Sequence, residues 1–124
     1  MKLAIDTNAI IDFLKQAAGA FDLLALIEEH ECFVSVITKL ELLKYPDMTP
    51  AEEETILDIL QIVPIMPLNT DIENETIAIS RATKLKLPDA IIGATAIVYK
   101  AEVVSSDPHF LNCPYPTLRI LKNL

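Results

Sequence analysis

Short apolar stretches alternate with longer segments of helical periodicity along the chain, and this alternation predicts the elements of the fold. Five of the apolar stretches are short and rich in β-branched residues, as is typical of strands buried in a sheet. Pro64 interrupts one of them and lacks the amide hydrogen that an inner strand donates, so this strand belongs at an edge or a bulge. The strand nearest the end of the sequence is also expected at an edge. The predicted strands cover residues 2–6, 32–36, 62–66, 102–106 and 117–121.

The segments between these strands carry apolar residues three and four positions apart, the spacing that places side chains on one face of a helix. That face is expected to pack on the core. Helices are predicted near 9–16, at 20–30 and 37–44, and from residues 50, 70 and 88 onward. The residues expected to face inward are Phe21, Leu24 and Ile27, then Ile37, Leu40 and Leu43, then Ile56, Leu57 and Leu60, and finally Ile72, Thr76, Ile79 and Thr83.

Local signals mark where several of these helices begin. Thr49 and Glu52 have the spacing of a capping box, in which each side chain accepts a hydrogen bond from the backbone amide of the other residue. Thr70 and Glu73 repeat the pattern. The helix opened by the Pro-Asp pair at 88–89 continues as AIIGATAIVYK and is apolar nearly all round. It should be the last helix and lie buried in the middle of the domain.

Alternating strands and helices predict an α/β fold, with a central, mostly parallel sheet of about five strands and helices on both faces. The 124 residues suffice for one domain, which is expected to span 1–124. No apolar run is long enough to cross a membrane and no signal peptide precedes the first strand, so we expect a soluble, cytoplasmic protein. Cys32 and Cys113 have neither the spacing of a zinc site nor that of a disulfide framework.

Acidic residues follow two of the predicted strands. Asp6 comes directly after the first strand, and Asp107 comes after the strand that ends in VVSS. The carboxyl ends of parallel strands share one edge of a sheet, which is where open α/β sheets bind ligands. Asp89 lies in the first turn of the nearly apolar helix, and Glu41 lies on a helix expected to pack on the core. The predicted fold therefore directs four carboxylates toward one edge.

Each of these acids also has an ordinary structural explanation. Asp6 and Asp107 could form turns, Asp89 could cap its helix, and Glu41 could pair with a neighbouring lysine. Four carboxylates together are harder to explain in this way, because a like-charged pair about 4 Å apart costs about 4 kcal/mol at an effective dielectric of about 20. A divalent cation removes that cost, and oxygen ligands without cysteine favour Mg²⁺ or Mn²⁺. Such a site could hold one ion or two.

The net charge of −8 argues against general electrostatic attraction of nucleic acid, since phosphate contacts need Lys or Arg. It does not exclude a nuclease whose divalent cations supply the positive charge. Basic side chains that flank the predicted site and could contact phosphates are Lys39, Lys44, Arg81, Lys84 and Lys86.

Four stretches of the sequence together resemble the PIN-domain ribonucleases, in particular the VapC toxins of VapBC toxin–antitoxin pairs. They are LAIDTNAIIDFL at the start, ITKLELL in the first third, LKLPDAIIGATA at 85–96 and VVSSDPHF at 103–110. The resemblance spans nearly the whole chain, and the third stretch is the most specific. It implies a metal-dependent endoribonuclease that cuts RNA with Mg²⁺ or Mn²⁺, a homodimer, and a small antitoxin protein that occupies the active-site groove.

The resemblance also implies which residues form the site. The metal-binding and catalytic acids are Asp6, Glu41, Asp89 and Asp107, and the polar residues that support them are Thr7, Asn8 and Ser105. The sequence departs from the family pattern at His109, because many relatives have an acid just before the final Phe. His109 could support the site or merely fill space.

Three other functions share part of this pattern. A phosphatase of the haloacid-dehalogenase type needs a second aspartate two residues after the first, where this chain has Asn8. A receiver domain needs a pair of acids near the end of its first strand, and this chain has one. A catalytically silent PIN domain that binds RNA or protein keeps the fold without the chemistry; the presence of all four acids disfavours it. The RNA target stays open.

Overall fold

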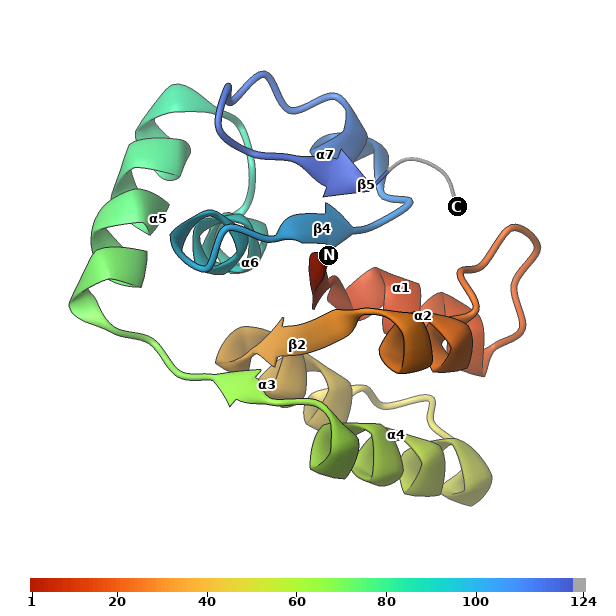
Figure 1. Ribbon diagram of the computed structural model, residues 1–124. Helices are drawn as coiled ribbons and strands as arrows, with labels where there is room; N and C mark the ends of the chain where they lie inside the picture. Colours follow the sequence, from red (N-terminus) through yellow and green to blue (C-terminus); the bar gives the residue numbers. More distant parts are fainter. Residues whose placement is uncertain (122–124) are drawn as a thin grey trace.

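The centre of the protein is a sheet of five strands in which every strand pair is parallel; the computed structural model describes residues 1–121. The strands are β1 (Lys2–Ile5), β2 (Glu31–Ser35), β3 (Ile65–Met66), β4 (Glu102–Val104) and β5 (Ile120–Leu121). Their order is β3-β2-β1-β4-β5, so the chain starts in the middle of the sheet and extends it on both sides (Figure 1). The predicted α/β fold and its two edge strands are confirmed.

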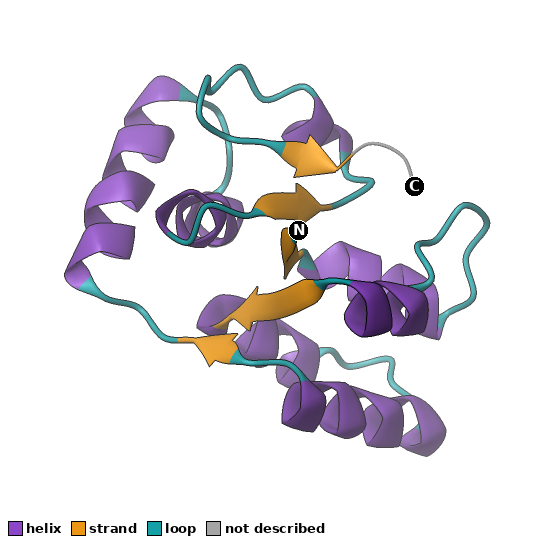
Figure 2. Cartoon of the chain, viewed as in Figure 1, coloured by secondary structure: helices purple, strands orange, loops and turns teal. Residues whose placement is uncertain are grey.

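Helices cover both faces of this sheet (Figure 2). They are α1 (Thr7–Leu14), α2 (Leu23–Glu29), α3 (Val36–Lys44), α4 (Pro50–Ile62), α5 (Thr70–Ala82), α6 (Leu87–Val98) and α7 (Pro108–Leu111). Side chains alternate along β1, so Leu3 and Ile5 join the core beneath α1, α2 and α4, whereas Ala4 joins the core beneath α6 and α7. α5 packs against α6. Within residues 1–121, no helix is both long and apolar enough to span a membrane.

Three elements differ from the sequence-based prediction. The strand predicted at 62–66 is reduced to β3, because Ile62 ends α4 and Pro64 has no amide hydrogen to donate. Pro64 hydrogen-bonds with the sheet only through its carbonyl, which accepts a hydrogen bond from the Val34 amide at 3.0 Å. The strand predicted at 117–121 is likewise reduced to β5. The nearly apolar helix is buried as expected, but it is not the last, since α7 follows. Four residues are too few to show a helical period, and α7 is held by burial of Phe110.

Of the residues predicted to face inward on three helices, Ile56 is buried and Ile27, Ile37 and Leu60 pack against the core, but four leucines do not. Leu24, Leu40, Leu43 and Leu57 were assigned to the core, and this is wrong, because these side chains are between 47% and 56% exposed. Each helix carries leucines on more than one face, so periodicity admits two orientations and docking on the sheet selects one. The fully buried residues of α2 and α3 are instead Leu23, Leu26, Thr38 and Leu42. In α4 the predicted Ile56 is buried together with Ile59, and the predicted Ile72, Thr76 and Ile79 of α5 are confirmed.

Only one of the two predicted capping boxes forms. At α4, Thr49 Oγ1 accepts a hydrogen bond from the Glu52 amide at 3.2 Å, and Glu52 Oε1 accepts one from the Thr49 amide at 2.9 Å. At α5 the residue one position earlier is the cap, since Asn69 Oδ1 accepts a hydrogen bond from the Ile72 amide at 2.8 Å. The box predicted to start at Thr70 is therefore wrong. Asn is a stronger cap than Thr, and its choice moves the helix start by one residue.

Replacing Asn69 with alanine is expected to lower the free energy of unfolding by about 1 kcal/mol, because the Ile72 amide loses its acceptor. Thr70→Ala is the matched control, since Thr70 is exposed at the first helical position. It should change that free energy by less than about 0.5 kcal/mol. Urea denaturation measures both variants. A larger loss for Thr70→Ala would support the capping box of Thr70 and Glu73 instead.

Candidate active site

Asp6 follows β1 at the carboxyl edge of the sheet and is 1% exposed. It occupies the N-cap position of α1, yet its side chain makes no capping hydrogen bond to that helix. Instead Ser105, which follows β4, donates a hydrogen bond from Oγ to Asp6 Oδ2 at 2.7 Å. The ordinary role of a helix cap therefore does not explain Asp6. Its carboxylate is held between the ends of two neighbouring strands.

Glu41 reaches the same edge from α3. Thr7, the first residue of α1, donates a hydrogen bond from Oγ1 to Glu41 Oε1 at 2.8 Å. The Thr7 hydroxyl also hydrogen-bonds with Thr38 Oγ1 at 3.0 Å, and both threonines are buried. Thr38 lies one helical turn before Glu41 in the stretch ITKLELL, so the two side chains lie on the same side of α3. Sequence reasoning did not single out Thr38, although its position relative to Glu41 carries that signal.

Asp107 is the N-cap of the short helix α7. Its Oδ1 accepts a hydrogen bond from the His109 amide at 2.9 Å and lies 2.9 Å from His109 Nδ1. Asn8 donates from Nδ2 to Asp107 Oδ2 at 3.3 Å, and the Asp107 amide donates to Ser105 Oγ at 3.0 Å. The alternative given for Asp107 from the sequence was a turn, and its structural role is instead that of a helix cap. Thr7, Asn8 and Ser105 each contact an acid, and His109 packs against Asp107 rather than merely filling space.

Asp89 lies in the first turn of α6 and faces a pocket of about 290 Å³, which we call the acidic pocket. Its walls are Asn8, Glu41, Lys84, Lys86, Pro88, Asp89, Asp107 and His109. Three of the four predicted acids thus share one cavity. The fourth, Asp6, is buried and hydrogen-bonded to Ser105, whose hydroxyl also accepts from the Asp107 amide. Four elements far apart in the sequence supply these acids.

The acids perturb one another electrostatically. The pKa of Asp6 is raised from 3.8 to about 7: burial is the largest cause, the charges of Asp89, Asp107 and Glu41 act in the same direction, and the hydrogen bond from Ser105 opposes them. Burial also raises the pKa of Asp89, with Asp107 and Glu41 adding to the effect. Burial acts on Asp107 in the same direction, but hydrogen bonds from His109 and Asn8 outweigh it and its pKa is lowered. Ionisation of Asp6 and Asp89 is therefore less favourable in the folded protein than in water.

The donor set suits a hard divalent cation. It consists of carboxylate oxygens with hydroxyl and amide groups beside them and contains no thiolate, which is the chemistry that Mg²⁺ and Mn²⁺ prefer. A bound cation would also favour the ionised forms of Asp6 and Asp89 and so lower their raised pKa values. Within residues 1–121, no three acidic, histidine or cysteine side chains are arranged to hold a cation together.

The basic residues predicted to flank the site divide into two groups. Lys84 and Lys86 line the acidic pocket beside Asp89 and Asp107. Lys39, Lys44 and Arg81 do not line it, and Arg81 borders a neighbouring pocket instead. The positive charges closest to a phosphate bound at the acids would therefore be those of Lys84 and Lys86, in the turn between α5 and α6.

Comparison with known proteins relates the whole of this architecture to one family. Residues 3–114 match the PIN domain family. A DNA-bound VapBC structure from Salmonella typhimurium has a TM-score of 0.78 at 20% identity, covering 98% of this chain and 97% of that chain. VapBC2 from Rickettsia felis, bound to a promoter DNA fragment, has a TM-score of 0.76 at 18% identity and covers 98% of both chains.

A toxin–antitoxin complex from Klebsiella pneumoniae shares 28% identity with this chain. Its TM-score is 0.67, and the match covers 95% of this chain and 99% of that chain. A sequence comparison with curated proteins gave no match. The fold is thus that of chains found in solved toxin–antitoxin complexes.

Proposed function

Because the chain belongs to the PIN domain family, we propose that it is a metal-dependent endoribonuclease that hydrolyses phosphodiester bonds in RNA. We further propose that it acts in the cytoplasm as the toxin of a toxin–antitoxin pair. One observation carries the enzymatic part: Asp6, buried at the end of the central strand, has its pKa raised to about 7 in the presence of three other acids. Such perturbed groups gather at functional sites.

The residues would divide the work as follows. Asp6, Glu41, Asp89 and Asp107 would hold Mg²⁺ or Mn²⁺, while Ser105, Thr7 and Asn8 fix three of these carboxylates by the hydrogen bonds described above. The bound ion supplies charge neutralisation at the phosphodiester and lowers the pKa of a water molecule. Lys84 and Lys86 would draw the substrate phosphate to the acidic pocket and orient it beside Asp89.

A protein partner is supported by exposed apolar side chains on α3 and α4. Leu40, Leu43, Leu57 and Ile62 are between 47% and 63% exposed on these two neighbouring helices. Clustered apolar exposure of this kind marks protein interfaces. The structural neighbours come from toxin–antitoxin complexes, and we propose that a small antitoxin covers this surface and the acidic pocket beside it. A homodimer, implied by the family resemblance, is proposed as well.

The metal requirement is the experiment that tests the enzymatic proposal. Purified protein is expected to cut a mixture of structured RNAs with Mn²⁺ or Mg²⁺, to stop when EDTA removes the metal, and to resume when Mn²⁺ is added in excess. Gel electrophoresis of end-labelled RNA measures the rate. Cleavage at an unchanged rate in EDTA would contradict the proposal, because four carboxylates without a cation cannot neutralise a phosphodiester.

A second function, RNA or protein binding without cleavage, would use the same fold and pockets but no bound cation. That function predicts that the wild type binds RNA but cuts none with either metal. It also predicts that Mn²⁺ leaves the melting temperature unchanged. Stabilisation by Mn²⁺ together with RNA cleavage would exclude it.

A further inference from the structure

A second, larger pocket adjoins the acidic pocket. It encloses about 580 Å³ between the end of α5, the turn into α6, and α7 with the residues that follow it. Lys84 and His109 line both pockets and form the boundary between them. An RNA strand with one phosphate at the acids would therefore place a neighbouring nucleotide at this second pocket. We call it the base pocket.

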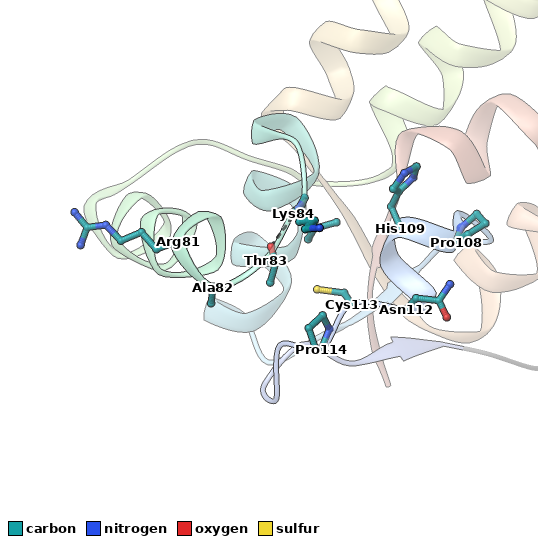
Figure 3. A pocket seen from close by; sticks show the side chains of 10 residues that line it. Arg81, Ala82, Thr83, Lys84, Pro108, His109, Asn112, Cys113 and Pro114 are labelled. Atoms are coloured by element: carbon teal, nitrogen blue, oxygen red, sulfur yellow. Dashed lines mark hydrogen bonds between the residues drawn. The ribbon is translucent and has the colours of Figure 1, made fainter.

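The walls of the base pocket are largely apolar and uncharged. Ala82, Leu85, Pro108 and Pro114 contribute carbon surface, and the free thiol of Cys113 lies among them. In Figure 3, the sulfur of Cys113 points across the pocket toward the turn at Thr83 and Lys84, while the ring of His109 is turned away from Cys113. These walls suit a flat, uncharged group with a polarisable face.

Charge is confined to the rim of the base pocket. Arg81 and Lys84 are exposed there, and within residues 1–121 neither forms a salt bridge. Figure 3 shows the Arg81 guanidinium extending from α5 away from the other side chains that line the pocket, whereas Lys84 lies beside Thr83 at the turn. A free lysine at the rim of an apolar pocket, with an arginine nearby, complements a phosphodiester chain that carries a base. In a protein with a net charge of −8 they are a local exception.

We propose that this pocket holds one unpaired nucleobase of the RNA, from a nucleotide next to the phosphodiester at the acidic pocket. The proposal rests on the function proposed above and adds a determinant of where the RNA is cut. Proteins read RNA sequence chiefly at unpaired bases, which they stack on side chains and bind through the base edges. The volume is in the range of small-molecule sites, and the exposed amide of Asn112 at its wall can bind a base edge.

Filling the pocket tests the proposal. Ala82→Trp places an indole at the pocket wall from an exposed position at the end of α5. Ser80→Trp adds the same bulk to the same helix at an exposed position that lines neither pocket, and it is the matched control. Both are assayed on an RNA oligonucleotide with a single cut site and on copies in which one nucleotide at a time is abasic. Thermal unfolding confirms that both variants are folded.

For the wild type and Ser80→Trp, an abasic nucleotide at one position beside the cut should lower kcat/KM about tenfold or more, in the range found for loss of one stacked base. The kcat/KM of Ala82→Trp on the intact RNA should be lower than that of the wild type by the same factor. The abasic substitution should then leave the kcat/KM of Ala82→Trp unchanged. If Ala82→Trp and the abasic nucleotide each lowered kcat/KM and their effects multiplied, the proposal would be overturned. An unchanged kcat/KM for Ala82→Trp on the intact RNA would overturn it as well. Both variants should bind Mn²⁺ like the wild type.

Failure of the enzymatic function would be seen separately, because the wild type would then cut no RNA at all. In that case the four nucleoside 5′-monophosphates are titrated into the protein and followed by the amide NMR signals of Leu85, Asn112 and Cys113. Shifts at these residues in the wild type and Ser80→Trp but not in Ala82→Trp would support the base pocket. Absence of shifts at these residues would overturn it.

Discussion

Asp89→Asn is expected to lower the rate of RNA cleavage by more than about a hundredfold, because changes to the groups that merely surround a metal site already cost about 10- to 100-fold. Asparagine keeps the size of the side chain and removes the charge that faces Glu41 and Asp107 in the acidic pocket. The same variant should bind Mn²⁺ more weakly. Single-turnover cleavage of labelled RNA and Mn²⁺ titration by calorimetry measure the two effects.

Asp71→Asn is the matched control for this variant. Asp71 lies in the first turn of α5 as Asp89 lies in the first turn of α6, so both changes remove a favourable charge at a helix start. Asp71 is exposed and lines neither the acidic pocket nor the base pocket. Its variant should cut RNA at the wild-type rate. Equal activities for wild type, Asp71→Asn and Asp89→Asn would remove Asp89 from the proposed active site.

Asp6→Asn is expected to make the metal-free protein more stable at pH 8, although it removes a residue proposed to be essential. The pKa of Asp6 is raised from 3.8 to about 7, so between these values the folded state holds a proton that the unfolded chain has released. The stability of the metal-free wild type therefore falls as the pH rises from about 4 to about 7. The difference in pKa corresponds to about 4 kcal/mol. Asparagine carries no charge, and its carbonyl oxygen can still accept the hydrogen bond from Ser105.

Thermal unfolding of EDTA-treated protein at pH 5 and pH 8 measures this effect. The wild type should lose stability between the two values, and Asp6→Asn should lose much less. Addition of Mn²⁺ at 100 times its dissociation constant should stabilise the wild type by about 2.7 kcal/mol and the variant by far less. Asp58→Asn, a change at an exposed position of α4, should behave like the wild type. A wild type equally stable at both pH values would contradict the perturbed pKa.

The sequence predicted the elements whose causes are local. The capping box of Thr49 and Glu52 needs only residues three apart, and the buried face of α5 follows from the spacing of Ile72 and Ile79. The parallel sheet follows from the alternation of strands with helices, since parallel neighbours require a crossover. The positions of the four acids at strand ends and on core-packing helices directed them to one edge of the predicted sheet, and the family resemblance implied their roles. Their ligand and catalytic roles are proposals that the experiments above address.

Other features depend on contacts between distant parts of the chain. Leu40 and Leu42 are equally apolar, and only the docking of α3 on the sheet buries Leu42 and exposes Leu40. The hydrogen bond from Ser105 to Asp6 joins residues 99 positions apart, and no local pattern announces it. The same is true of Thr7 and Glu41, which meet across 34 positions.

The amino-acid sequence by itself determined the order of elements apart from α7, the parallel sheet and the position of acids after β1 and β4, because periodicity, caps and residue type act over a few residues. Only the tertiary structure decided which acid is buried, which one caps a helix, and that a second pocket opens beside them. Burial and electrostatic coupling depend on distances in space, and the chain fixes those distances only when its helices have packed on the sheet.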